Sequence, residues 1–487
     1  MIQNIHIRKP DFNERFYMCR NYEKLYTNFN ITVKYNKPIT PGILSNALKT
    51  MIHDNPVMTL NCFQTDQIEP STVNYRNQVI RPLEKIRFRD VAEFVDINTF
   101  DESILEQLGD ETFPMNCDKP LWKIKVFQQA DGQQYISMIY EHIFFDGNSG
   151  IHFQKEIAKA LDESQESEQE LIEDLFDYEK DMKSNPGPVH LPVTEQVKLF
   201  KPTFFTFLRY HVTEPVLQFF RPLLAYIRQL LPNSWFKKPT FGVSKLYHVD
   251  LNNQLGDCKT KFKIARFTTE EVKKMIKFCK ANDLKLTLYL HIIALNALQS
   301  TVFSKTHPNE QIGTRSVCAI DGRRYRTEGS GFIHGSIVAR LVTDFPYFEG
   351  SLLKYMKYQY QLLQTELETT RDIKTNRISE YCNILDSFKN KVTAEGGRTI
   401  VITNLGKLPK FGGKYEINDI YFSGNLGYMH TFNFSFVSCD TGLNVVLGYL
   451  PGFEEYFVND KPIMDVAVQM FHDSAINLAT EDTKDLQ

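Results

Sequence analysis

The hydrophobic and polar positions of the first 160 residues predict strands and helices in turn. Residues 29–35 have the β-branched and aromatic content of a strand, and the stretch from Thr40 to His53 opens on a Thr-Pro pair that predicts a helix. Residues 122–142 alternate with period two around an Asp-Gly turn, which predicts a hairpin. A helix capped by Asn148 or Ser149 should follow and run to Leu161.

The second half of the chain has a similar mixture of patterns. Residues 262–267 predict a strand, and Thr268 with Glu271 forms a capping box for the helix that should come next. Further elements are expected as an apolar helix at 286–304, a strand at 331–342, a long helix at 352–369, and strands at 398–406 and 432–438. Mixed strands and helices in both halves predict an α/β protein built as two lobes, each a mixed β-sheet with helices.

A break in composition separates the two predicted lobes. Asn185 to Pro192 reads NPGPVHLP, a density of Pro and Gly that interrupts both helices and strands. We therefore expect an N-terminal lobe at 1–184, a Pro- and aromatic-rich basic connector at 185–255, and a C-terminal lobe at 256–487. Two lobes of about 200 residues and a connector fit the 487-residue length.

Composition and charge narrow the classes of function. With 42% hydrophobic and 24% charged residues the chain has an ordinary globular composition, and 56 basic against 59 acidic residues exclude the strongly basic footprint of a general nucleic-acid binder. The charge is unevenly placed, however. Asp162 to Asp181 holds ten acidic residues and one lysine, whereas Val197 to Pro239 holds seven basic residues and one glutamate. The acidic stretch is expected to be a solvated helix face.

Targeting and metal-binding signals are weak in this sequence. The first residues lack an apolar core of signal-peptide length, so we expect no export. The eight cysteines form no C-x-x-C pair and read as reduced thiols, without a zinc site. The uncharged stretch Leu286 to Ser304 is about as long as a bilayer span, but its polar residues favour a core helix.

The sharpest local motif is His142-Ile-Phe-Phe-Asp146-Gly147, at the exit of the predicted hairpin. A histidine there can aim its imidazole into a cleft while the glycine-relieved turn folds away, and an imidazole near neutral pH is a competent general base. Asp146 would orient the loop by pairing with an arginine. The alternative is a partly buried strand-end histidine followed by an ordinary turn.

Several segments together resemble the coenzyme-A-dependent acyltransferase superfamily, which includes chloramphenicol acetyltransferase and peptide-synthetase condensation domains. More closely, the chain is similar to the fungal alcohol acetyltransferase family. The segments that carry the resemblance are NERFYMCRNYEKLYTNFNITVKYN, ALKTMIHDNPVM, HIFFDGNSGIHFQKEI, TLYLHIIALNAL, AIDGRRY with GFIHGSIV, and ITNLGKLP. They span most of the chain, and the H-x-x-x-D-G element with a downstream Asp-Gly-Arg is the specific combination.

The resemblance implies two chloramphenicol-acetyltransferase-like lobes with a channel between them and His142 at its middle. By that analogy His142 would deprotonate the acceptor, which attacks the thioester directly, with acetyl-CoA as co-substrate and no permanently bound cofactor or metal. Asp146 would pair with Arg323, or with Arg324 in its place, and Gly147 would keep the loop narrow. The alternative for Arg323 is a solvated surface arginine.

This sequence also departs from parts of the superfamily. Glu141 occupies the position where condensation domains carry a first histidine, and no D-F-G-W-G is present. These departures weaken peptide-bond formation and plant-type acyl transfer. Asn404, in the predicted ITNLG turn, is a candidate oxyanion donor or channel residue, with a plain turn as the alternative. Three other histidines are interpreted as core residues: His291, His334 and His430.

The basic connector interleaves ten aromatic residues with Lys and Arg between Val197 and Pro239. Its uncharged runs reach about eight residues, too short to span a bilayer but suited to an interfacial helix on an anionic membrane. The alternative is a tether packed on one lobe.

The leading hypothesis is therefore an acetyl-CoA-dependent alcohol O-acetyltransferase acting on a hydrophobic alcohol. The alternatives are N-acetylation of a long-chain amine or sphingoid base, and a catalytically silent membrane-docking lipid-binding module. The expected location is the cytoplasm, or the periphery of the endoplasmic reticulum or lipid droplets.

Overall fold

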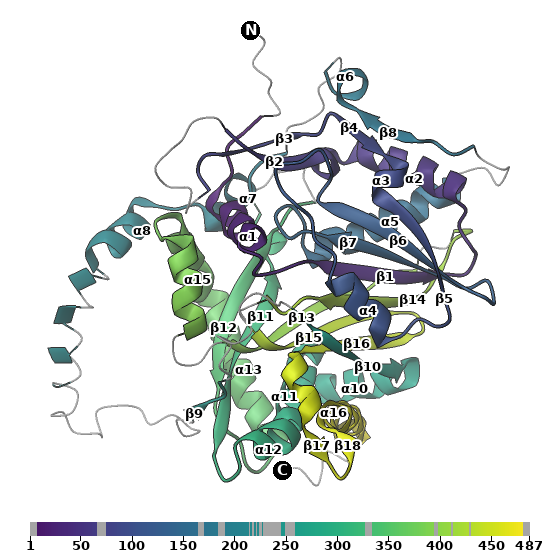
Figure 1. Cartoon of the computed structure of the whole chain (residues 1–487). Helices are drawn as coiled ribbons and strands as arrows, with labels where there is room; N and C mark the ends of the chain where they lie inside the picture. Colours follow the sequence, from purple (N-terminus) through teal and green to yellow (C-terminus); the bar gives the residue numbers. More distant parts are fainter. Residues whose placement is uncertain are drawn as a thin grey trace.

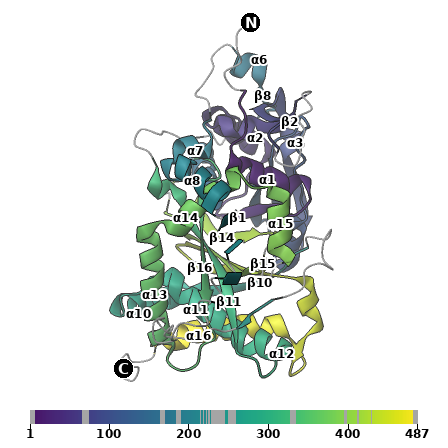
Figure 2. The ribbon, with the colours of Figure 1, turned by 90° about the vertical axis from the view of Figure 1, so that its left-hand side faces the viewer.

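Two large β-sheets flanked by helices, with three two-stranded sheets beside them, make up the computed structural model of the chain (Figure 1). The structure describes residues 7–65, 75–163, 170–183, 190–213, 215–216, 219–220, 222–223, 226, 245–248, 259–326, 334–393, 398–410, 413–427 and 430–480. Figure 2 shows the N-terminal half stacked on the C-terminal half, so the two-lobe α/β architecture expected from the sequence is confirmed. The predicted Pro-Gly break at 185–189 and most of the connector beyond Tyr226 lie outside the described residues.

The first sheet has five strands in the order β14-β1-β7-β6-β5. The predicted strand and hairpin are confirmed: β1 is Phe29–Tyr35, β6 is Trp122–Gln129 and β7 is Gln134–Tyr140. The edge strand β5, Ala92–Ile97, pairs in parallel with β6, while the other pairs are antiparallel.

Two helices, α2 and α5, pack together against this first sheet. Helix α2, Pro41–Asp54, is capped by Thr40 as predicted. Helix α5, Gly147–Glu163, lies directly on β1 because Gly150 has no side chain: a Cβ at that position would come within 2.6 Å of Ile31. The loop that carries the H-x-x-x-D-G motif is therefore held between strand β7 and a closely packed helix.

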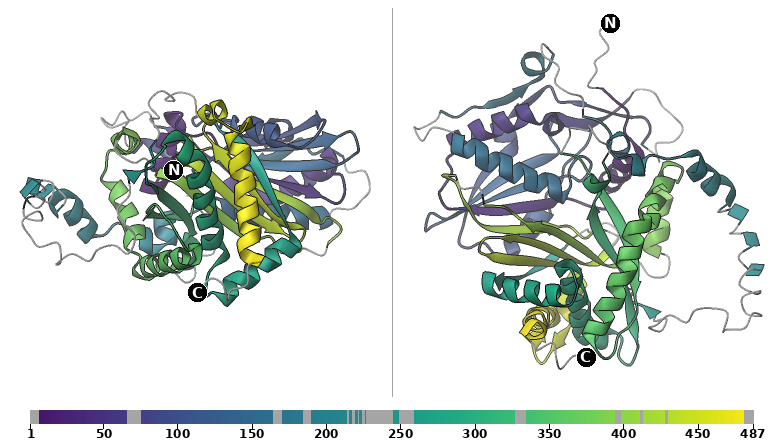
Figure 3. Two further views of the ribbon diagram at one scale, coloured as in Figure 1. Left: turned by 90° about the horizontal axis from the view of Figure 1, so that it is seen from below. Right: turned by 180° about the vertical axis from the view of Figure 1, so that it is seen from behind.

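The second sheet follows the order β10-β16-β15-β13-β11-β12, with the short strand β9 beside β11. Its bounds are β9 Lys245–Leu246, β10 Lys261–Thr268, β11 Ile312–Asp321, β12 Val338–Phe345, β13 Arg398–Lys407, β15 His430–Cys439 and β16 Gly442–Tyr449. Its helices include α10 Thr269–Ala281, α11 Leu286–Leu298, α13 Leu352–Thr369 and α16 Ile463–Thr480. The Thr268–Glu271 capping box is present, and α13 has the predicted bounds. Figure 3 shows these helices along one side of the sheet.

One strand joins the two lobes. β14, Ile417–Gly424, comes from the C-terminal half of the sequence but pairs with β1 along its whole length in the first sheet. It also contacts the second sheet, where Asn444 of β16 donates its side-chain amide to the Ile420 carbonyl at 2.7 Å. The division at residues 184 and 256 stays a prediction, and the topology adds that a segment of the C-terminal range builds the N-terminal sheet.

The apolar helix predicted at 286–304 is a core helix. The stretch Leu286–Thr306 is the one helix among the described residues that is long and apolar enough to cross a membrane, and 72% of its most apolar window is buried inside the protein. Helix α11 packs against α16 in the core of the second lobe.

Three local expectations were wrong in whole or in part. The acidic stretch is helical at its two ends, where Asp162 and Glu163 end α5 and where Glu179 and Asp181 lie in α6, Tyr178–Asp181. Between them, Asp174–Asp177 forms strand β8, which pairs with the basic strand β4, Lys85–Arg87, and Lys85 Nζ lies 3.4 Å from Asp177 Oδ2. The strand predicted from residue 331 begins at Val338, and residues 331–333 lie outside the described chain. Helix α5 begins at Gly147, before the predicted caps, because Asp146 accepts from the Ser149 amide.

Candidate active site

His142 stands two residues beyond the end of β7, half-buried between aromatic rings. The Tyr17 ring, from helix α1 (Phe12–Tyr22), is stacked on the imidazole with ring centroids 4.6 Å apart and planes 8° apart. The Phe29 ring at the start of β1 lies 4.9 Å away at a tilt. These contacts fix the orientation of the imidazole and exclude water from much of its surface.

The second half of the chain reaches His142 through Ser336. The Ser336 hydroxyl, in the loop before β12, lies 3.4 Å from His142 Nδ1. His142 therefore lies where elements from both halves of the sequence meet.

The electrostatic surroundings keep this imidazole neutral. Burial, together with the positive charge of Arg20, lowers the pKa of His142 to about 3. Arg20 comes from α1, and its guanidinium lies 4.0 Å from the centre of the Tyr26 ring and 5.5 Å from that of Tyr17. Near neutral pH the ring is thus in the form that can accept a proton.

Glu141 is a buried carboxyl group directly before the histidine. It accepts hydrogen bonds from the His142 backbone amide and from the Asn21 side chain, each at 2.8 Å. Burial raises the pKa of Glu141 to about 7. Where condensation domains carry a first histidine, this chain has Glu141, and the Glu141 carboxylate links the His142 backbone to helix α1.

Asp146 and Arg323 form the ion pair expected from the motif. Arg323 Nη1 lies 2.9 Å from Asp146 Oδ2, and Nη2 lies 3.0 Å from Oδ1, a bidentate arrangement with both side chains almost fully buried. Asp321 accepts a further bond from Arg323 at 3.1 Å. Arg323, and not the fallback Arg324, is the partner. Despite burial, the Arg323 charge holds the pKa of Asp146 below its usual range.

Further groups complete the surroundings of Asp146, and the sequence did not reveal them. The Ser149 amide donates to Asp146 Oδ1 at 2.8 Å, and the Ile337 amide donates to Oδ2 at 2.8 Å. The Ser149 hydroxyl lies 3.0 Å from the Gly335 carbonyl and also receives a bond from Arg323. The carboxylate therefore joins the start of α5 to the loop before β12. The Ser three residues after Asp is a capping spacing that could have indicated Ser149.

Two glycines in the predicted motifs allow close approaches. A Cβ on Gly147 would lie 2.5 Å from Leu405 Cδ2 of β13, so the absence of a side chain lets β13 pack against the loop. A Cβ on Gly322 would lie 2.7 Å from the Ile337 carbonyl and 2.9 Å from the Phe200 ring. Gly147 therefore has a packing function that can be tested directly.

Asn404 has a different position from the one expected. It lies within strand β13, next to a register irregularity between Asn404 and Lys407, and not in a free turn. Its side-chain amide donates to the Thr287 hydroxyl at 2.9 Å, and its oxygen accepts from the Gly406 amide at 2.8 Å. Its neighbour Leu405 contacts the motif loop, but both polar atoms of Asn404 already have partners. A role for Asn404 at the oxyanion stays a prediction.

The three other histidines interpreted as core residues, His291, His334 and His430, pack inside the fold. His291 is buried, with Nε2 3.0 Å from the Ser316 hydroxyl. The His334 ring stacks on Phe153 at 4.0 Å, and its Nε2 lies 3.1 Å from Glu156. His430 begins β15 and is partly buried. Within the described ranges no three His, Cys, Asp or Glu side chains are grouped to hold a metal ion.

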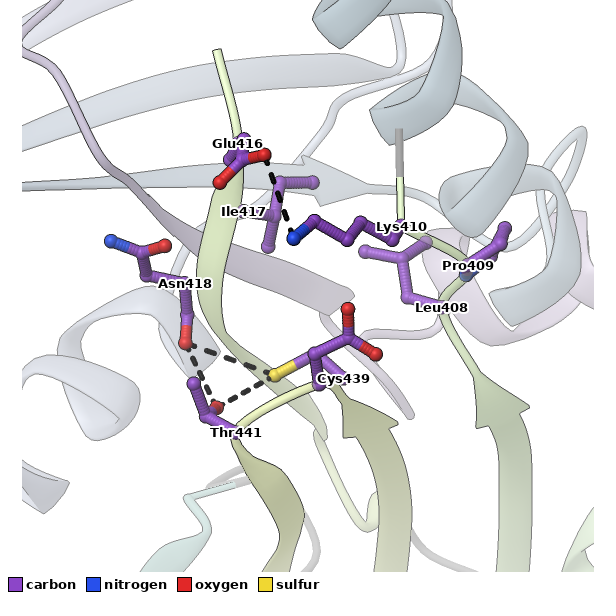
Figure 4. A pocket seen from close by; sticks show the side chains of 9 residues that line it. Leu408, Pro409, Lys410, Glu416, Ile417, Asn418, Cys439 and Thr441 are labelled. Atoms are coloured by element: carbon purple, nitrogen blue, oxygen red, sulfur yellow. Dashed lines mark hydrogen bonds and ion pairs between the residues drawn. The ribbon is translucent and has the colours of Figure 1, made fainter. Parts of the chain in front are cut away.

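A small pocket elsewhere is separate from this site. It has a volume of about 100 Å³ and lies where the end of β13, the start of β14 and the β15–β16 turn meet (Figure 4). Lys410 and Glu416 lie 3.8 Å apart across it, and Cys439 Sγ is 3.0 Å from the Thr441 hydroxyl. None of the H-x-x-x-D-G residues lines this pocket.

Comparison with known proteins agrees with this geometry. A family model described as alcohol acetyltransferase matches residues 12–471. Among solved structures, a trichothecene 15-O-acetyltransferase from Fusarium sporotrichioides is similar, with a TM-score of 0.65 at 11% identity over 97% of this chain and 94% of that one. The first condensation domain of the CDA synthetase has a TM-score of 0.57 at 10% identity, over 98% and 97% of the two chains. A comparison with curated protein sequences gives no significant match.

Proposed function

Because the chain belongs to the alcohol acetyltransferase family, we propose that it transfers an acetyl group from acetyl-CoA directly to a hydrophobic alcohol. Family membership makes the chain an acyltransferase. The acetyl donor, the hydrophobic acceptor and the role of His142 as general base are the proposed parts. The observation that supports them best is a neutral, oriented imidazole on a loop held by a buried Asp–Arg pair.

In the proposed reaction the His142 imidazole removes the proton from the acceptor hydroxyl as its oxygen attacks the thioester carbonyl. The tetrahedral intermediate collapses, the carbon–sulfur bond breaks, and the proton on the imidazolium passes to the departing thiolate. The products are an acetate ester and free coenzyme A. No acyl-enzyme forms, so the protein supplies one base and a fixed geometry.

The Nδ1 atom of His142 faces the Ser336 hydroxyl. We therefore assign removal of the acceptor proton to the other ring nitrogen, Nε2. The low pKa of His142 keeps the imidazole neutral near pH 7, which is the form that a general base requires. Asp146 is a positioning residue in this scheme. It touches neither substrate nor proton but holds the loop through Arg323, Ser149 and Ile337.

The direct test is release of free thiol from acetyl-CoA in the presence of a panel of medium-chain alcohols. The purified chain should release thiol only with an acceptor, and His142→Gln should lower the rate by roughly 10²- to 10⁴-fold, the range for loss of a general base. His53→Gln is the matched control, since the His53 side chain is 77% exposed and lies in helix α2. No thiol release, or full activity in His142→Gln, would refute the proposal.

The same base could act on an amine, so the acceptor panel should include one. N-acetylation of a long-chain amine or sphingoid base is separated from ester formation by competition between an alcohol and an amine of equal chain length. Preferential acetylation of the amine would assign the chain to the alternative. Liposome binding without any turnover would instead favour the silent lipid-binding module.

A further inference from the structure

The connector exposes an unusual concentration of large apolar side chains. Lys198 to Tyr226, called here the aromatic arm, holds ten of the seventeen large hydrophobic side chains that are exposed among the described residues. Phe205 and Phe219 are each 78% exposed. Figure 1 shows α8, Phe204–Leu208, and the short helical pieces after it standing away from the two sheets. Apolar side chains gathered on one exposed segment mark an interaction surface.

The spacing of these side chains indicates an apolar helix face. Val216, Phe219, Phe220, Leu223 and Tyr226 are described as helical, and each of them is exposed. They follow one another at intervals of three, one, three and three residues, a spacing close to that of one helix face. Exposed apolar side chains at such spacing are typical of a surface that is buried in another phase or against a partner.

The charge of the same segment favours an anionic surface. Lys198, Lys201 and Arg209 are exposed at its beginning. Between Lys198 and Tyr226 the sequence carries four basic residues and one glutamate, although the whole chain has a formal charge of −3. The positive charge is therefore local to the arm, and aromatic side chains beside basic ones suit the interface of a membrane with anionic headgroups.

We propose that the aromatic arm docks on the surface of an anionic lipid bilayer, with its apolar side chains in the headgroup region and its basic residues on the lipid phosphates. The segment lies on the membrane and does not cross it. Its longest uncharged run, Pro202 to Leu208, has seven residues, whereas a spanning helix needs about 20.

The base of the arm lies beside the groups that hold the motif loop. Phe200 packs in one apolar cluster with Ile337, whose backbone amide donates to Asp146 at 2.8 Å. The Phe207 and Tyr210 rings lie 5.7 Å and 6.0 Å from the Tyr381 ring. Docking therefore brings the lipid surface to the side of the protein where Asp146 is held. This consequence rests on the proposed function: an acceptor dissolved in the bilayer would start close to the site.

Vesicle flotation of the full chain tests the docking itself. The protein should float with phosphatidylcholine vesicles that contain phosphatidylserine, and less with phosphatidylcholine alone or at high salt. Phe205→Ser with Phe219→Ser should weaken binding about tenfold or more, because both side chains are exposed and their loss leaves the core intact. Phe457→Ser is the control, since Phe457 is 51% exposed on another lobe surface. Lys198→Glu with Lys201→Glu should also weaken binding, and Lys274→Glu with Lys277→Glu on α10 should not.

Two results would overturn the proposal. One is flotation that is absent in the natural sequence or unchanged in the Phe205 and Phe219 double variant. The other is a concentration-dependent dimer, seen by sedimentation, that the same double variant converts to monomer, because a second copy would then cover the arm.

Activity assays separate this proposal from the proposed function. With a short, water-soluble alcohol the double variant should keep its thiol-release rate, whereas with a long-chain alcohol held in vesicles its rate should fall in step with binding. If the double variant lost activity with both alcohols, the arm would be needed for the reaction itself, and its proposed function in lipid docking alone would be contradicted. Normal flotation without any thiol release would leave the docking intact and refute only the proposed reaction.

Discussion

At the scale of single residues, the environment of His142 determines what it can do. The stacked Tyr17 ring, the Phe29 ring and the nearby Arg20 charge all favour the neutral imidazole, and the pKa of His142 is lowered to about 3. With this lowered pKa, the His142 imidazole stays unprotonated at every pH value well above 3. At pH 5.5, one unit below its pKa of about 6.5, an ordinary histidine would be only about one-tenth unprotonated.

We therefore expect kcat/KM for a soluble acceptor to show no loss with an apparent pKa near 6.5. The measurement is a pH profile of thiol release between pH 5 and 8. Glu141, whose pKa is raised to about 7 by burial, can add an inflection of its own in this range. That inflection should disappear in Glu141→Gln. A fall near pH 6.5 that persists in Glu141→Gln would show that His142 titrates normally and would contradict this account.

The Asp146–Arg323 pair gives a second prediction at this scale. Asp146→Asn removes the buried countercharge of Arg323, whose side chain is only 10% exposed, and leaves it the partly exposed carboxylate of Asp321. Breaking a buried pair in this way costs about 3 kcal/mol or more of unfolding free energy. The rate of thiol release should fall as well, at least tenfold, because the loop that carries His142 loses its anchor. Denaturant unfolding and the acetyl-transfer assay measure the two effects.

An exposed ion pair of the same kind provides the control. Arg315 and Asp344 also form a bidentate pair, at 2.7 Å and 2.9 Å, but their side chains are 35% and 49% exposed. Asp344→Asn should cost less than about 1 kcal/mol and leave activity unchanged. If Arg323→Ala keeps full activity, Arg323 does not position the loop.

At the scale of secondary-structure elements, the approach of β13 to the motif loop depends on Gly147. A methyl group there would lie 2.5 Å from Leu405 Cδ2, so Gly147→Ala should displace Leu405, shift the loop and reduce kcat severalfold. The double variant Gly147→Ala with Leu405→Ala should recover much of the loss, because it removes the atom that clashes. Gly109→Ala is the control, since its Cβ would make an ordinary 3.5 Å contact with Phe262. No recovery in the double variant would assign Gly147 a function other than packing.

Elements with strong local signals could be predicted from the sequence. Strand β1, helix α13 and the capping box at Thr268 follow from periodicity and caps, and the structure has them at the predicted bounds. Asp174–Asp177, in the middle of the acidic stretch, was misassigned to a helix because it pairs with strand β4, Lys85–Arg87, which lies 87 or more residues earlier, and local charge patterning cannot reveal a distant partner. The start of α5 was missed by two residues because Asp146 both caps the helix and binds Arg323.

The site shows the same division between local and distant information. The motif, with the downstream Asp-Gly-Arg, indicated the pairing of Asp146 with Arg323. It could not indicate the stacked Tyr17 ring or the Ile337 amide, since neither belongs to a motif and both depend on how distant segments pack. Asn404 was misplaced in a turn because the strand continues through a register irregularity that the ITNLG sequence conceals.

At the scale of the whole molecule, β14 makes the two lobes depend on each other. It pairs with β1 in the first sheet, and Asn444 of β16 donates to the Ile420 carbonyl and, at 2.6 Å, to Asp419. No strand was expected at residues 417–424, because the pairing partner is almost 400 residues away in sequence. The lobes therefore share a strand as well as an interface.

This shared strand predicts a single cooperative unfolding transition for both lobes. If the lobes were independent, calorimetry would show two transitions, and each substitution would move only the one to which it belongs. We expect one transition instead. Ile420→Ala, at a fully buried position of β14, and Leu290→Ala, at a fully buried position of α11, should each lower its midpoint and should each destabilise the whole chain by about 3 kcal/mol. Two resolved transitions, with Ile420→Ala moving one and Leu290→Ala the other, would show that β14 does not couple the lobes. Because His142 contacts Tyr17 from one half and Ser336 from the other, such independence would also remove the reason for its fixed orientation.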